Sequence, residues 1–126
     1  MIRLLVIGSG GFLGAIARYG MTLWIQERTS SPLPHGTMWV NVLGCFLLGF
    51  LATWLAARPE QGEHWPLFLR VGLLGAFTTF STLGLETVQL FTDGEWRAAL
   101  LSLGGNLLLG VLGIVLGGAS ARAVGF

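Results

Sequence analysis

The sequence has little charge and no lysine. Of its 126 residues, 10% are Asp, Glu, Lys or Arg, whereas a soluble domain carries about 25%. The seven basic residues are all arginine, and six acidic residues leave a net charge of +1. This balance excludes the basic patch with which nucleic-acid-binding proteins meet phosphate. Together with a hydrophobic fraction of 53%, it predicts a membrane protein with no nucleic-acid partner.

Cysteine and histidine are also scarce. The single Cys45 cannot form a disulfide within the chain, and the two histidines, His35 and His64, lie in different predicted loops. There is no metal-ligand cluster, no nucleophile beside a base and no phosphate-binding loop in the sequence. The glycine-rich stretch "GSGGFLG" lacks the strand–helix context of a dinucleotide site and is explained by helix packing. The sequence therefore does not predict an enzyme.

Long apolar runs are what the sequence does contain. About 20 residues of helix cross the hydrocarbon core of a bilayer, and a spanning segment must satisfy its own backbone, which favours α-helices. The predicted class is an all-α membrane protein, a single four-helix transmembrane domain over 1–126. The predicted transmembrane helices cover about 4–25, 38–57, 67–91 and 98–121.

The arginines are distributed almost evenly between the two ends of this predicted bundle. Four helices place both chain termini on one side, which then carries Arg3, Arg58, Arg70 and Arg122. Arg28 and Arg97 fall on the other side, with Arg18 inclined towards it. The positive-inside rule sets orientation by such differences, and this one is small. It favours cytoplasmic termini weakly and permits insertion in both orientations, and so an antiparallel homodimer.

Polar residues inside spans are costly and are functional candidates by default. Arg18 either anchors its helix at the interface or attracts anions to a pore mouth. Asn41 either donates to a permeating anion or ties helices together. Ser102 and Asn106 are four residues apart and share one helical face. Taken alone, each of Asn41, Ser102 and Asn106 is more typical of a hydrogen bond between helices. Taken together with the polar residues of the third predicted helix, they favour a polar track through the membrane.

The third apolar run holds the most concentrated polar segment, "GAFTTFSTLGLE" (75–86). Its hydroxyl residues compete with the helical backbone for hydrogen bonds. Composition slightly favours a helix broken at mid-membrane over a kinked continuous one. Non-helical backbone at that depth is tolerated only inside protein or along a wet cavity. Freed carbonyls then bind a cation, and freed N–H groups and hydroxyls bind an anion.

Three apolar side chains and one carboxylate flank these hydroxyls. Phe77, Phe80 and Leu83 follow one another at intervals of three, and the positive edge of a phenyl ring can face an anion. Glu86 follows Thr82 by one helical turn. Its carboxylate lies near the rim, accepts hydrogen bonds from hydroxyls or is protonated, and a role in proton coupling is an open alternative.

These segments carry a resemblance to a known family. "GGFLGAIARY" (10–19), "GTMWVNVLGCFLLG" (36–49) and "GLLGAFTTFSTLGLE" (72–86) resemble the signatures of the CrcB/Fluc family of bacterial fluoride channels. The match covers all four helices, and the third segment is the most diagnostic.

The resemblance implies a fold and an activity. It implies antiparallel, dual-topology dimers in the bacterial inner membrane, with two fluoride pathways at the interface and a third helix broken at its centre. It also implies passive fluoride export, which confers fluoride resistance. It further implies a structural sodium ion on the two-fold axis, bound by the backbone carbonyls of Gly75 and Thr78.

Particular residues are assigned to the pathway through this resemblance. Asn41 corresponds to the pore asparagine, Phe80 to the anion-facing phenylalanine and Arg18 to the arginine of the first signature. The remaining polar positions on or near the implied track are Thr37, Ser81, Thr82, Ser102 and Asn106. Glu86 and Phe77 are possible accessory residues.

One position departs from the family pattern. The motif is usually "TTFSTF", whereas this sequence has Leu83 in place of the second phenylalanine. Leucine supplies no positive ring edge. Slower conduction, altered selectivity, compensation by Phe77 and a role in a heterodimer with a paralogous subunit all follow as hypotheses. Leu83 keeps open the alternative of a non-conducting partner subunit. Glu86, the only candidate carboxylate, keeps open a second alternative, a small proton-coupled cation or drug exporter.

Overall fold

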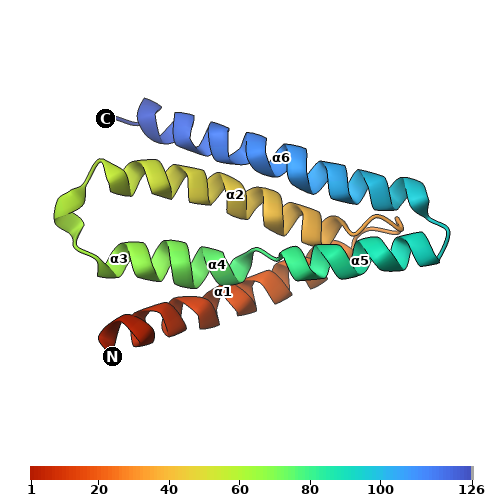
Figure 1. The fold of residues 1–126 in the computed structure, drawn as a ribbon, viewed down its shortest axis with the longest axis horizontal. Coiled ribbons are helices and arrows are strands. Elements are labelled where there is room, and N and C mark those ends of the chain that lie inside the picture. Colours follow the sequence, from red (N-terminus) through yellow and green to blue (C-terminus); the bar gives the residue numbers. More distant parts are fainter. Residues whose placement is uncertain (126) are drawn as a thin grey trace.

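The structure, a computed structural model, describes residues 1–125 as an all-helical chain (Figure 1). Four helical stretches are long and apolar enough to cross a membrane. The third stretch, His64–Thr92, consists of several helical segments. The elements in chain order are α1 (Ile2–Gln26), α2 (His35–Ala56), η1 (Pro59–Gln61), α3 (His64–Pro66), η2 (Leu67–Leu74), α4 (Gly75–Phe77), α5 (Phe80–Thr92) and α6 (Trp96–Ala123).

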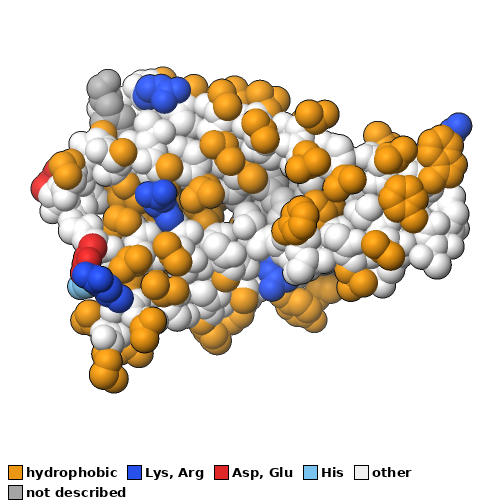
Figure 2. All heavy atoms as spheres, in the orientation of Figure 1, with side chains coloured by type: hydrophobic (Ala, Val, Ile, Leu, Met, Phe, Trp, Pro, Cys, Tyr) orange, Lys and Arg blue, Asp and Glu red, His pale blue; other side chains and the backbone are white. Residues whose placement is uncertain are grey.

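The four stretches run up and down, so both described chain ends lie at one end of the bundle (Figure 1). The same end holds the connection between α2 and α3, and the opposite end holds segments 27–34 and 93–95. Apolar side chains cover the length of the molecule on the face shown in Figure 2. Leu108 and Val111 of α6, for example, are 75% and 64% exposed. Such a surface is stable in lipid, where it needs no polar cover.

The first helix packs on the third stretch through glycines. A Cβ atom added at Gly10 would meet the backbone of Phe68 and Leu73, and one at Gly14 would overlap the Leu73 carbonyl. On the other helix, a Cβ at Gly72 would meet the Ile7 carbonyl. Backbones approach this closely only where side chains are absent. The glycine-rich stretch "GSGGFLG" was predicted to serve helix packing, and the contacts of Gly10 and Gly14 confirm it.

The second and fourth helices pack in the same manner. A Cβ at Gly117 of α6 would overlap the Phe46 carbonyl, and one at Gly49 of α2 would overlap the Ile114 carbonyl. A Cβ at Gly113 would lie 3.2 Å from the Val42 carbonyl. The bundle is therefore two glycine-mediated helix pairs, α1 with the third stretch and α2 with α6.

The two pairs meet through a small core. Val40 of α2 packs with Leu74 and Phe77, which lie just before the hydroxyl run 78–82 of the third stretch. Five polar side chains are buried in the described bundle: Thr37, Asn41, Thr87, Ser102 and Asn106. Two of them, Asn41 and Asn106, lie beside residues 78–79, so the packing of the pairs brings distant polar residues to one place.

Candidate functional site

The third stretch loses its helical backbone at two residues. Thr78 has φ −83° and ψ 155°, and Thr79 has φ −149° and ψ 117°, both in the extended region. Helix α5 then begins at Phe80 with Thr79 as its N-cap, whose Oγ1 accepts a hydrogen bond from the Thr82 N–H at 3.2 Å. Threonine suits this position because its hydroxyl satisfies an N–H group that has no partner within the helix. The polar segment thus supplies its own cap.

Asn41 of α2 holds the extended residues in place. Its Oδ1 accepts from the Thr79 N–H at 2.8 Å, and its Nδ2 donates to the Thr79 carbonyl at 3.1 Å. One amide side chain therefore pairs with both polar groups of a single backbone residue. Nδ2 also donates to Asn106 Oδ1 at 2.8 Å, so all of its donor capacity is used. Asn41 ties α2, α6 and the third stretch together.

Because Asn41 holds Thr79 through these two hydrogen bonds, backbone carbonyls at the end of α4 lose the N–H partners that they would have in a continuous helix. In a continuous α-helix the Thr79 N–H would bond to the Gly75 carbonyl, but here it bonds to Asn41. The Thr82 N–H would bond to the Thr78 carbonyl, but it bonds to Thr79 Oγ1. The Ala76 carbonyl accepts from Arg18 Nε at 3.1 Å. A cation at this position complements the partial negative charge of a helix C-terminus.

Hydroxyls and amides extend in both directions from Asn41. Towards α6, Asn106 Nδ2 donates to the Ser102 carbonyl at 2.8 Å. Ser102 Oγ is buried and has no hydrogen-bond partner among the described residues. Towards α5, Thr79 Oγ1 donates to Thr82 Oγ1 at 2.9 Å and lies 3.4 Å from Ser81 Oγ. The predicted residues of α2, the third stretch and α6 therefore do lie together.

A second polar pair lies one turn further along α5. Thr37 Oγ1 of α2 donates to Glu86 Oε1 at 2.8 Å. Thr37 is 2% exposed, and Glu86 Oε2 is a buried atom without a hydrogen-bond partner in the described chain. Because Thr82 and Glu86 are four residues apart, they share a face of α5. The hydroxyls and Glu86 thus form one polar column along α2 and α5.

An open cavity of about 210 Å³ borders this column and includes Phe80, Leu83, Asn41 and Asn106 in its lining. Phe80 is 76% exposed and Leu83 is 3% exposed. Phe77 does not line this cavity, because it packs in the core with Val40 and Leu74. The position of Leu83, where the family pattern has a phenylalanine, therefore lies at the cavity wall.

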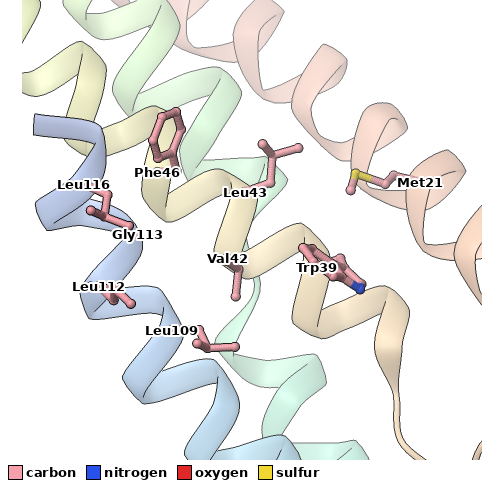
Figure 3. Close-up of a pocket in the computed structure, with 9 residues that line it drawn as sticks. All are labelled: Met21, Trp39, Val42, Leu43, Phe46, Leu109, Leu112, Gly113 and Leu116. Atoms are coloured by element: carbon pink, nitrogen blue, oxygen red, sulfur yellow. The ribbon is translucent and has the colours of Figure 1, made fainter. Parts of the chain in front are cut away.

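Another cavity, of about 320 Å³, lies on the opposite face of α2 (Figure 3). Trp39, Val42 and Phe46 of α2 line it together with apolar residues of α6 and Met21 of α1. No charged or amide side chain contributes to it. The two faces of α2 thus differ in chemistry, and the face that carries Asn41 is the candidate site.

Thr79 and Cys45 belong to this site, although the sequence analysis does not assign either to the pathway. Thr79 provides the cap and both backbone contacts of Asn41, and Cys45 lines the cavity beside Phe80. Thr79 lies within the hydroxyl run 78–82, so the sequence did mark it as a polar residue inside a span. The half-buried Cys45 gave none, because an isolated cysteine in an apolar helix is typical of ordinary packing.

A multi-pass helical membrane protein with a column of amides and hydroxyls within its spans is of the class that moves polar solutes or ions across the bilayer. Comparison with known proteins identifies the group. The family model described as "CrcB-like protein, Camphor Resistance (CrcB)" matches residues 5–118. The chain belongs to this family.

Relatives in several bacteria share most of the sequence length. The fluoride-specific ion channel FluC of Acidobacterium capsulatum is 41% identical over 116 residues, which cover 92% of this chain and 93% of the relative. FluC of Dehalococcoides mccartyi is 40% identical over 117 residues, covering 93% and 90%. FluC of Roseiflexus sp. is 37% identical over 123 residues, covering 98% and 99%. The similarity therefore extends over all four spans.

Proposed function

We propose that this protein is a subunit of a fluoride-selective channel that lets fluoride leave the bacterial cytoplasm passively. The supporting observation is the polar column. Its hydrogen bonds join Asn106 and Asn41 to the turn of Thr79 and Thr82, and the Thr37–Glu86 pair lies one turn further along α5. The relatives of this chain are named fluoride-specific channels. Fluoride is small and strongly hydrated, so a pathway must replace its water with other donors. Hydroxyls and the N–H groups at a helix N-terminus are such donors.

Helix α5 supplies two kinds of donor at one place. Its first N–H groups lack helical acceptors, and Thr79 Oγ1 accepts from only one of them, that of Thr82. The hydroxyls of Ser81 and Thr82 lie on the same turn. Phe80 at the cavity wall adds a ring edge. Asn41, whose donors are engaged, orients this turn. We assign ion contact to Ser81, Thr82 and Phe80, and positioning to Asn41 and Asn106.

We further propose that two copies assemble as an antiparallel, dual-topology dimer. The supporting observations are the exposure of Phe80 and the open side of its cavity. A polar pathway that opens sideways to lipid would leave its groups unsatisfied, so a second copy is the natural cover. The nearly even distribution of arginines between the two ends allows both orientations.

The break of the third helix at mid-membrane and the sodium ion belong to the same proposal. The Gly75 and Thr78 carbonyls fit a cation, because the N–H groups that would bond to them in a helix bond elsewhere. These two carbonyls and their copies in a second subunit would hold sodium. When bound, the ion supplies positive charge beside the extended residues. Arg18 already provides a cation at the Ala76 carbonyl.

The proposal is tested by reconstituting the purified protein in liposomes loaded with potassium fluoride or potassium chloride. A valinomycin-linked efflux is expected with fluoride, read by a fluoride electrode, and none above background with chloride. The matched control is Asn41→Leu, which removes the clamp on Thr79 and is expected to abolish the flux. No fluoride release from wild-type protein, or equal release of chloride, would reject the proposal.

Of the other hypotheses from the sequence, the exporter is not favoured. Glu86, its only candidate carboxylate in a span, is bonded to Thr37, and the relatives are named as ion channels. Proton-coupled exchange would show proton release on addition of a cationic dye. The hypothesis of a non-conducting partner subunit depends on Leu83, and its test is given in the Discussion.

A further inference from the structure

A third cavity, of about 320 Å³, lies at the end of the bundle away from the chain termini. It lies between the end of α1, the 27–34 segment and α5. Two prolines of that segment contribute to its wall. Its other lining residues are Thr22, Leu23, Gln26, Glu86, Gln89, Leu90 and Asp93. On α5 the lining follows spacings of three and four residues, which is one helical face.

This cavity meets the polar column at Glu86. Oε1 of that residue is bonded to Thr37, whereas Oε2 is buried without a partner among the described residues. A buried carboxylate oxygen without a donor is costly. Five of the residues that line the cavity are polar or charged, and the cavity has room for several water molecules. Glu86 thus belongs both to the polar column, through its bond with Thr37, and to the wall of this cavity.

The charge of this cavity is negative. Asp93 follows α5 directly and lies two helical turns beyond Glu86, about 10 Å along the axis. The basic residues at this end point elsewhere. The Arg28 guanidinium lies over the Trp24 ring, 4.4 Å from its centroid, and the Arg97 guanidinium lies over the Trp96 ring. Neither arginine lines the cavity. An anion that approaches Glu86 through this space therefore passes Asp93 first.

We propose that this cavity is the aqueous mouth of the conduction pathway at this end of the molecule, and that Asp93 slows the access of anions to it. The proposal rests on the proposed fluoride channel function and assigns residues to its mouth. Gln26 and Gln89 provide amide donors there, while the carboxylate of Asp93 repels the approaching ion. The other end of the bundle differs, because Arg70 lines a cavity there. The cavities at the two ends of the bundle thus differ in the sign of the charge that lines them.

The first experiment compares two carboxylates at the same end of the molecule. Asp93→Asn and Glu95→Gln remove the same charge two residues apart, but Glu95 does not line the cavity. At fluoride concentrations far below saturation and at low ionic strength, Asp93→Asn is expected to raise the flux about threefold or more. Glu95→Gln is expected to leave it nearly unchanged. The gain should disappear near 1 M salt, where the Debye length is about 3 Å.

The second experiment measures access of water to the cavity. Gln89→Cys places a thiol in the wall, and Val88→Cys, the matched control, places one at a position that is 63% exposed and outside the cavity. Each protein in liposomes is treated with an anionic methanethiosulfonate, with Cys45 of the parent chain as background. Gln89→Cys is expected to gain the reagent mass rapidly and lose most of its flux. Val88→Cys and the parent should do neither.

The outcomes separate the mouth from the channel function. If the parent conducts fluoride but Gln89→Cys is neither labelled nor blocked, or Asp93→Asn and Glu95→Gln change the flux equally, the assignment of the mouth is wrong and the channel stands. If the parent conducts no fluoride, the proposed function fails, and the mouth assignment fails with it. Labelling is read by mass, so it also reports whether the cavity is aqueous in that case.

Discussion

Leu83 is the residue at which this chain departs from the family pattern "TTFSTF". Its side chain is 3% exposed and lines the cavity of about 210 Å³ that also includes Phe80. Phe77 lies in the core with Val40 and Leu74 and outside that cavity, so it does not supply the missing ring there. The wall of the cavity therefore has one aromatic edge where the family pattern has two.

Leu83→Phe is expected to increase fluoride flux. Edge-to-face pairs of aromatic rings gain about 0.5–1.5 kcal/mol. A similar gain for a ring edge that faces fluoride corresponds to a rate increase of up to about tenfold. The cavity beside Leu83 provides space for the larger side chain. The measurement is the liposome efflux assay, with Leu83→Met as the control that adds length without a ring.

Two results would change this interpretation of Leu83. An equal gain in Leu83→Met would show that bulk, and not the ring, limits the rate. An absence of flux in wild type and in Leu83→Phe alike would instead favour a subunit that conducts only with a different partner chain.

At the scale of elements, glycine decides how the third stretch is placed. Its first part, η2, lies against α1 because Gly10, Gly14 and Gly72 let the two backbones meet. This contact positions α4, and therefore also the extended residues Thr78 and Thr79 that Asn41 clamps from α2. The geometry of the polar column thus depends on glycines that bear no functional group.

Gly14→Ala is expected to destabilise the protein by roughly 1–3 kcal/mol, because the added methyl group overlaps the Leu73 carbonyl and overpacking carries such a cost. The matched control is Gly20→Ala on the same helix, where an added Cβ has no neighbour within 4 Å. That control is expected to be stabilised by about 0.5–1 kcal/mol through helix propensity. The measurement is the midpoint of unfolding in mixed micelles with increasing SDS, and equal shifts in both variants would contradict the proposed role of the contact.

At the scale of the whole molecule, the two ends are nearly alike in positive charge. Arg3, Arg58, Arg70 and Arg122 lie towards the end with the termini, and Arg28 and Arg97 lie towards the other. So small a difference is a weak orientation signal. Opposite insertion of identical chains is what an antiparallel dimer requires.

Labelling of a single cysteine added at the N-terminus, in a Cys45→Ala chain, is expected to show about half of the termini on each side of the membrane. The reagent is a membrane-impermeant maleimide applied to whole cells and then to lysed cells. The double substitution Glu60→Arg and Gln61→Arg adds positive charge at the exposed connection after α2 and should place nearly all termini in the cytoplasm. Fluoride flux should fall in that variant, and retention of full flux with one orientation would reject the antiparallel dimer.

Composition and spacing were sufficient to predict the class of the protein, its four spans and the polar residues that lie within them. A low charge content and apolar runs leave a chain no stable alternative to crossing the membrane as helices, and polar groups inside such runs are few enough to identify. Only the tertiary structure decided what each group does. In the sequence analysis, Asn41 either donates to an anion or ties helices together. In the structure it is bonded to Thr79 and Asn106, and Phe77 lies in the core. The physical reason is that hydrogen bonds and packing across helices depend on how α2, α5 and α6 meet, and residue spacing within one helix carries no information about its neighbours. The same holds for the mouth at Glu86, whose wall combines α1, the 27–34 segment and α5.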